Sequence, residues 1–351
     1  MNIPCILLLG PVLLALLALD CRAADTTRLD DATRKKVLAE LSSKIAGSYV
    51  FPDKAKLVVE RLDAREKSRA YRGAQDISQL AALLTADLRQ PTRDLHLEVA
   101  YSAQPLPDMD EDAAPSAELD RMIRKTLEAE NFGIRKVEAL AANIGYIDLR
   151  SFDTLAFSRP SIAAAMALIA HTDALIIDLR RNNGGDPHTV AFMSSYLFDK
   201  PTHLNNMYWR QDKRTDEFWT SKDVPGKKFG GSKKVYVLTS KDTFSAAEEF
   251  SYNLKQLRRA TIIGEPTGGG AHPGRVHRIH PHLSVFIPNG RAINPVSKTN
   301  WEGTGVAPDV RVKAADALRT AERLALQDLL RAAADPVHAQ RLRNRLHGLD
   351  H

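Results

Sequence analysis

From Asn131 onward the sequence alternates short β-rich runs with helical ones, and this alternation constrains the fold more than any other feature. "NIGYIDLRSF" precedes "RPSIAAAMALIAHTD", "ALIIDLRRN" precedes "DPHTVAFMSSYLF", and "KKVYVLTS" precedes "SAAEEFSYNLKQLRR". Each pair has the pattern of a strand followed by a helix. Repetition of that unit predicts an α/β core whose strands pair largely in parallel.

The region before the core has helical periodicity. Val37, Leu38, Leu41 and Ile45 follow a 3.6-residue period after the possible caps Asp30 and Asp31, and Leu80, Leu83, Leu84 and Leu88 do so after Asp76. Residues 25–102 are therefore predicted to form a small helical N-terminal domain that ends in the strand-like "LHLEVAYS".

Three further stretches complete the predicted organisation. Residues 103–130 begin with an acidic, proline-containing segment and are predicted to be a linker, and residues 131–335 to be the core. Within the core, "VHRIHPHLSVFIPNGRAI" predicts a hairpin with Asn289-Gly290 near its turn. The last predicted helix stops at Pro336, which leaves residues 336–351 as a C-terminal tail.

The first 24 residues predict a secretory signal peptide. The apolar run from Ile6 to Leu19 is too short to span a bilayer, and small residues suited to cleavage follow it. A short amphipathic anchor is the alternative. Because Cys5 and Cys21 both lie in this segment, the mature, exported chain would have no thiol for disulfides, nucleophilic catalysis or metal binding. The expected location is periplasmic or secreted.

The charge pattern excludes one class of partner. The formal net charge is +6, but the basic residues are interspersed with acidic ones and form no stripe with stacking aromatics. Nucleic acid is therefore not an expected partner. There is no second long apolar stretch, so no stable membrane span is expected after cleavage, and no feature of the sequence indicates an oligomeric state.

The candidate site follows from the α/β pattern, because such sheets bind ligands at the carboxyl ends of their strands. Ser245 lies in such a loop, at the start of a predicted helix, where it is either an N-cap or a nucleophile. Gly184 and Gly185 lie in another, where paired glycines allow the backbone to approach a ligand closely or simply to form a tight turn.

A nucleophilic serine needs a base. No lysine lies between Lys255 and Lys298, which argues against a Ser-Lys dyad in the glycine-rich "GEPTGGGAHPG". The candidate bases are three histidines, His96, His188 and His272, and spacing alone does not choose among them. "HRIHPHL" would place His280 and His282 on one strand face, a weak metal-site pattern without nearby acids. Glu302, beside Trp301, is a plausible acid for the same site.

Together, "ALIIDLRRNNGG", "TSKDTFSAAEEFSYNLK", "ATIIGEPTGGGAHPG" and "NWEGTGVAPDV" resemble the S41 family of serine peptidases, the tail-specific or C-terminal processing peptidases. The branch with the greatest likeness includes the interphotoreceptor retinoid-binding protein modules and the tricorn protease core. The resemblance implies a crotonase-like ββα spiral core that follows a helical N-terminal domain.

The resemblance also implies roles for particular residues. Ser245 would be the nucleophile, and an oxyanion hole would form from the amide of Ala246 and that of Gly184 or Gly185. In the tricorn-like branch a histidine is the base, and it maps onto His96 of "RDLHLEV", although Leu95 stands where that branch has a small residue. Glu302 maps onto the supporting glutamate. No metal and no organic cofactor are implied.

Better-known members of the family carry a PDZ domain before the core. The stretch from Ser102 to Ala142 is too short for one, since most independent domains exceed about 50 residues. The sequence thus predicts an exported serine peptidase acting on peptides or unfolded proteins through an acyl-enzyme. The alternative is a non-catalytic carrier of a small apolar ligand, because the retinoid-binding relatives use the same fold.

Overall fold

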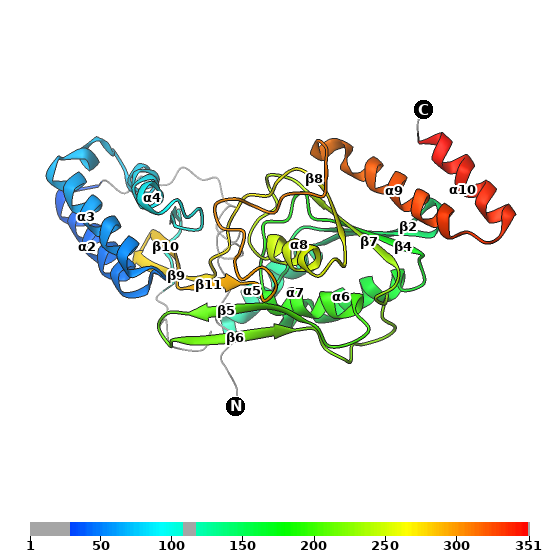
Figure 1. Cartoon of the computed structure of the whole chain (residues 1–351). Coiled ribbons are helices and arrows are strands. Elements are labelled where there is room, and N and C mark those ends of the chain that lie inside the picture. Colours follow the sequence, from blue (N-terminus) through cyan, green and yellow to red (C-terminus); the bar gives the residue numbers. More distant parts are fainter. Residues whose placement is uncertain (1–28, 108–116, 350–351) are drawn as a thin grey trace. The chain divides into compact units, whose positions relative to one another are not determined.

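The computed structural model describes residues 29–107 and 117–349 (Figure 1), so the predicted signal peptide lies outside the described residues. The chain divides into two compact units. The first comprises the described part of Met1–Arg124 with Met207–Asp216 and His272–Ala292, and the second comprises Lys125–Asn206, Glu217–Ala271 and the residues from Ile293 onward. The sequence predicts contiguous domains, whereas each unit gathers separate stretches of chain.

Two helices of the first unit begin where the sequence predicts them. The side chain of Asp30 accepts a hydrogen bond from the amide of Thr33, and that of Asp76 accepts one from Gln79, so both aspartates are N-caps. Apolar residues at helical spacing are buried in one core, which confirms the predicted periodicity. The three long helices are α2 (Asp31–Ser48), α3 (Pro52–Lys67) and α4 (Ile77–Thr92).

A small antiparallel sheet completes the first unit, with strand order β1-β10-β9. Its strands are β1 (Glu98–Tyr101), β9 (Gly274–His280) and β10 (Leu283–Pro288). The hairpin turn lies at Pro281 and His282, so the prediction of a turn near Asn289-Gly290 is wrong. Gly290 instead packs closely on a neighbouring strand, because a Cβ there would lie 2.7 Å from a ring carbon of Trp209.

The second unit is built on a six-stranded sheet of order β12-β8-β7-β4-β3-β2. Neighbouring strands from β12 to β3 pair in parallel, and only β2 pairs antiparallel, with β3. This confirms the predicted α/β core. The strands are β2 (Ile134–Leu140), β3 (Ile144–Leu149), β4 (Ala174–Asp178), β7 (Lys234–Thr239), β8 (Thr261–Gly264) and β12 (Val310–Arg311).

Both faces of this sheet are covered, which explains why its strands are continuously apolar. Successive side chains of a strand point to opposite faces. In β4, Leu175 and Ile177 lie in a core cluster with residues of α6, α7 and α8, whereas Ala174 and Ile176 lie in a second cluster with α9 and α10. The covering helices are α6 (Leu155–Ile169), α7 (Pro187–Ser194), α8 (Ala246–Gln256), α9 (Ala317–Ala332) and α10 (Pro336–Gly348) (Figure 1).

Two helices lie where the sequence predicts none. In the predicted linker, α5 (Ala117–Ala129) forms because Ile123 and Leu127, one turn apart, are buried, and because the acidic Glu118 and Asp120 complement its N-terminus. In the predicted tail, Pro336 begins α10 instead of stopping a helix, since proline is tolerated in a first turn and Asp335 caps it.

The remaining strands carry the chain from one unit to the other. They form a three-stranded sheet of order β11-β5-β6. Their bounds are β5 (His203–Trp209), β6 (Arg214–Trp219) and β11 (Gly290–Ile293). Short 3-10 helices lie at Ala70–Gly73, Asn131–Gly133, Ala141–Asn143, Ser195–Leu197 and Ala314–Asp316.

Candidate active site

Ser245 lies on the turn that leads from β7 into α8, and its backbone is strained. Its φ is 54° and its ψ is −120°, a conformation that side-chain-bearing residues rarely adopt and that costs about 1–3 kcal/mol. Its amide donates a hydrogen bond of 2.9 Å to Oε2 of Glu248. An ordinary N-cap residue has extended backbone, so a capping role alone does not account for this conformation.

Gly184 lies directly beside this serine. A Cβ on Gly184 would be 2.7 Å from the Cβ of Ser245 and 3.0 Å from the amide nitrogen of Ala246, and its φ is +109°. Both the space and the backbone therefore require glycine. The amide of Gly184 donates to Oδ1 of Asn182 at 2.9 Å. The structure thus brings three of the predicted site residues, Ser245, Ala246 and Gly184, together.

Gly185 is required for a different reason. Its φ is +136°, and a Cβ there would lie 2.0 Å from the carbonyl oxygen of Phe152, with which it forms an isolated bridge. Because the Gly184 amide is already bonded to Asn182, the amide of Gly185 is the better candidate to accompany that of Ala246 as a donor to a substrate.

Glu248 ties the serine turn to the glycine-rich loop. Its Oε1 accepts from the Gly269 amide at 2.7 Å and from the hydroxyl of Thr267 at 2.5 Å, while Oε2 accepts from the Gly270 amide at 2.8 Å. Burial raises the pKa of Glu248 to about 7, and these hydrogen bonds oppose the rise. Glu248 was not predicted as a site residue, although Ser245 and Glu248 have the three-residue spacing of a capping box.

Glu302 lies at the other side of the same loop. Its Oε2 accepts a hydrogen bond of 2.6 Å from the amide of Ala271, and its own amide donates to Oδ1 of Asn300 at 3.0 Å. The adjacent Trp301 donates through its indole to the carbonyl of Gly270 at 2.6 Å. Glu302 is therefore held by the second unit, the unit that also contains Ser245.

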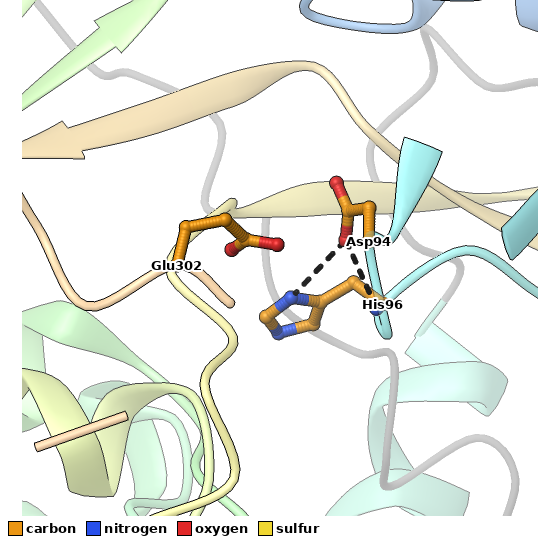
Figure 2. A group of neighbouring side chains, drawn as sticks. All are labelled: Asp94, His96 and Glu302. Atoms are coloured by element: carbon orange, nitrogen blue, oxygen red, sulfur yellow. Dashed lines mark hydrogen bonds and ion pairs between the residues drawn. The ribbon is translucent and has the colours of Figure 1, made fainter. Parts of the chain in front are cut away.

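His96 belongs to the first unit, between α4 and β1. Its amide donates to Oδ1 of Asp94 at 3.0 Å, and its Nδ1 lies 3.9 Å from the same oxygen (Figure 2). Burial lowers the pKa of His96 to about 4. The charge of Asp94 opposes this shift, whereas the charges of His272 and Arg89 add to it. His96 is thus a neutral imidazole at physiological pH, the state that a general base needs.

His272, the third candidate base, makes the shortest side-chain contact of Asp94. Its Nδ1 lies 2.8 Å from Oδ2 of Asp94, and both side chains are buried. The hydroxyl of Tyr49 donates to the same oxygen at 3.1 Å. Asp94 and Tyr49 were not singled out from the sequence. The signal for Asp94 is its position two residues before His96, and nothing in the sequence points to Tyr49.

The other histidines singled out from the sequence have different neighbours. The ring of His188, on α7, packs against Phe218 with centroids 5.1 Å apart. His280 ends β9, and His282 lies in the following turn, where its Nδ1 is 2.9 Å from the carbonyl oxygen of Ser102. The prediction that His280 and His282 share one strand face is therefore wrong, because the strand ends between them.

The strained Ser245 lies between a strand and a helix, and Gly184 packs against it. These features identify the class of this protein as α/β proteins whose candidate site is built around a serine. Comparison with known families gives the more specific assignment. The model of "Peptidase family S41" matches residues 143–312, and that of the "N-terminal domain of Peptidase_S41 in eukaryotic IRBP" matches residues 23–133. The chain belongs to peptidase family S41, as the sequence motifs predict.

Individual relatives are distant. The chain is 28% identical over 167 residues to carboxyl-terminal-processing peptidase 2, chloroplastic, of Arabidopsis thaliana, covering 47% of this chain and 31% of that protein. It thus spans about a third of the length of this curated relative.

Two solved structures share the fold over most of the chain. Mature CPAF has a TM-score of 0.56 at 13% identity, covering 89% of this chain and 98% of that one. A lipoprotein from Streptococcus agalactiae has a TM-score of 0.55 at 15% identity, covering 84% and 96%. Both likenesses support the predicted fold class, a mixed α/β core with a helical N-terminal region.

Among the described residues, no helix combines the length and the apolar composition needed to cross a bilayer.

Proposed function

We propose that this protein is an exported serine peptidase that hydrolyses peptide bonds through an acyl-enzyme intermediate. The observation that carries the proposal is the strained backbone of Ser245 at the N-terminus of α8, with Gly184 pressed against it. Strain of this kind is retained where the surrounding structure holds a functional group in place. Membership of peptidase family S41 supplies the reaction class.

In the proposed reaction, His96 takes the hydroxyl proton of Ser245 as the serine oxygen attacks the substrate carbonyl carbon. The amides of Ala246 and Gly185 donate to the resulting oxyanion. The imidazolium of His96 then gives its proton to the leaving amine, and the acyl-enzyme forms. Water, deprotonated by His96, releases the acid product and restores the serine, and Glu302 supports the positive charge on His96.

Substrate and location belong to the same proposal. We infer export from residues 1–24, which have the pattern of a cleaved export signal, and propose that the mature enzyme acts outside the cytoplasm. The substrates are peptides or unfolded proteins, because an extended chain must reach a serine on a short turn between a strand and a helix. Because the stretch from Ser102 to Ala142 is too short for a PDZ domain, the proposal includes no capture of a substrate terminus by strand addition to such a domain there.

The test compares the wild type with Ser245→Ala and His96→Ala on a diverse peptide pool, with new termini identified by mass spectrometry. A fluorophosphonate probe, with its adduct located by peptide mapping, reads nucleophilicity directly. Cleavage should fall by roughly 10⁴- to 10⁶-fold in each variant, as expected when a catalytic nucleophile or base is removed.

Ser251→Ala is the matched control. Ser251 is a buried serine of the same helix, and its hydroxyl donates to the carbonyl of Ala247 at 2.8 Å, so it takes no part in the proposed chemistry. This variant should cleave and label like the wild type. If wild type and variants all leave the pool intact and carry no adduct on Ser245, the peptidase proposal fails in favour of a ligand carrier.

A further inference from the structure

The buried carboxylate of Asp94 is divided between two histidines. Its Oδ2 lies 2.8 Å from Nδ1 of His272 and accepts from the hydroxyl of Tyr49 at 3.1 Å. Its Oδ1 accepts from the amide of His96 at 3.0 Å and lies 3.9 Å from Nδ1 of that residue. Each oxygen therefore has its own set of partners.

The charge of Asp94 determines which atoms of this cluster carry protons. Burial works to raise its pKa, but the hydrogen bond and charge of His272, with a smaller contribution from His96, outweigh that effect and hold the pKa below its usual value. An ionised carboxylate only accepts hydrogen bonds. The Nδ1 of His272 therefore carries a proton and donates a hydrogen bond to Asp94.

The geometry of a carboxylate links the two sides. The group is planar, so a partner that holds Oδ2 also determines where Oδ1 points. His272 and Tyr49 hold Oδ2, and Figure 2 shows the imidazole of His96 beside the carboxylate. Without His272, Oδ2 would lose its partner at 2.8 Å and keep the hydroxyl of Tyr49 at 3.1 Å, so rotation of the carboxylate about χ2 would be less restrained.

We propose that His272 is a positioning residue for the peptidase reaction: by binding Oδ2 of Asp94, it directs Oδ1 toward the imidazole of His96. This inference rests on the proposed role of His96 as the base. When His96 accepts the serine proton, it becomes an imidazolium whose Nδ1 proton points to Oδ1. A distance of 3.9 Å before substrate binds is compatible with this, because catalytic hydrogen bonds often shorten only in the substrate complex.

The test uses two substitutions that separate positioning from chemistry. His272→Ala removes the imidazole that binds Oδ2 of Asp94 and leaves the hydroxyl of Tyr49 in place. His272→Asn keeps a donor to Oδ2, because the side-chain amide nitrogen of asparagine takes the place of Nδ1, but it removes the basic imidazole. We expect kcat to fall roughly 10- to 100-fold in His272→Ala with little change in KM, as for a misplaced catalytic group, and to be largely restored in His272→Asn.

His282→Asn is the matched control, since its Nδ1 lies 2.9 Å from a backbone carbonyl in the same unit and takes no part in the proposed chemistry. It should match the wild type in kcat. If His272→Asn is as inactive as His96→Ala, His272 acts as a base itself and the positioning role is overturned. Unchanged kcat in His272→Ala would overturn it as well.

Crystal structures of the two variants provide a readout that does not depend on activity. The carboxylate of Asp94 should turn away from His96 in His272→Ala and keep its orientation in His272→Asn. An unchanged carboxylate in His272→Ala contradicts the inference even if no peptide is cleaved by any form. Absence of cleavage in the wild type would instead count against the proposed function.

Discussion

The two units hold their candidate functional residues by different means. In the second unit, backbone geometry holds Ser245 in position, because its φ is 54° and Gly184 packs against it. In the first unit, hydrogen bonds between side chains place Asp94, from His272 and Tyr49. A change of backbone freedom should therefore damage the second unit most, and a change of side-chain donors the first.

Burial also acts on the two units with opposite consequences. It lowers the pKa of His96 in the first unit to about 4 and raises that of Glu249, on α8 in the second, to about 8. The cause is the same, because a buried group resists becoming charged. The sign differs because a histidine is charged when protonated and a carboxyl group when deprotonated. Acid should weaken the first unit, and alkali the second.

The largest effect is expected at Glu249. Its pKa is higher in the folded protein than in the unfolded chain, so the stability of the second unit falls as the pH rises from about 4.5 to 8, by about 5 kcal/mol. Glu249→Gln should be more stable than the wild type at pH 8 and similar to it near pH 5. Hydrogen exchange in α8, measured at several urea concentrations, gives the stability of both proteins at each pH.

Glu128→Gln, at an exposed position of α5, is the control and should leave this pH dependence unchanged. Parallel pH profiles for the wild type and Glu249→Gln would contradict the assignment of the alkaline weakening to Glu249.

The next largest effect tests the backbone-built site. Gly184→Ala forces a Cβ against Ser245 at a φ of +109°, so it should displace the serine turn and the neighbouring amides. We expect kcat/KM to fall by roughly 10²- to 10³-fold, the usual result of losing one oxyanion donor. Gly47→Ala, in α2 with no atom within 4 Å of the added Cβ, should retain full activity and raise the melting temperature slightly.

A smaller effect is expected in the first unit at His96. The pKa of His96 is 6.5 in the unfolded chain and about 4 in the folded one. The stability of this unit therefore falls as the pH drops from 6.5 to 4, by roughly 3 kcal/mol. His96→Gln should flatten that slope, as measured by hydrogen exchange in α4 at several urea concentrations. An equal slope in both proteins would show that another group causes it.

Much of the fold was predictable because it depends on short-range patterns. The caps Asp30 and Asp76 lie three residues from the amides they bind, and the apolar strands of the second unit alternate with helices as the parallel sheet requires. The family follows from four loop motifs and is confirmed. The export signal, the domain boundaries and the roles of the site residues stay predictions.

The errors came from patterns with two local meanings. Pro336 suits both the end of one helix and the first turn of another, and the presence of Asp335 as a cap favours the second. Residues 103–130 resembled a linker because they begin with an acidic stretch, but burial of Ile123 and Leu127 stabilises α5 in the second half of this range. Asn289-Gly290 has the composition of a turn, yet Gly290 is needed for packing on Trp209.

By itself, the sequence determined the α/β alternation, the position of Ser245 at the start of a helix and the set of histidines from which a base must come. Only the tertiary structure decided that His272 binds Asp94, 178 residues away along the chain, and that Gly184 presses on Ser245. The physical reason is range: caps and periodicities act between neighbours in sequence, whereas the partner of a buried polar group is chosen by the packing of the whole unit.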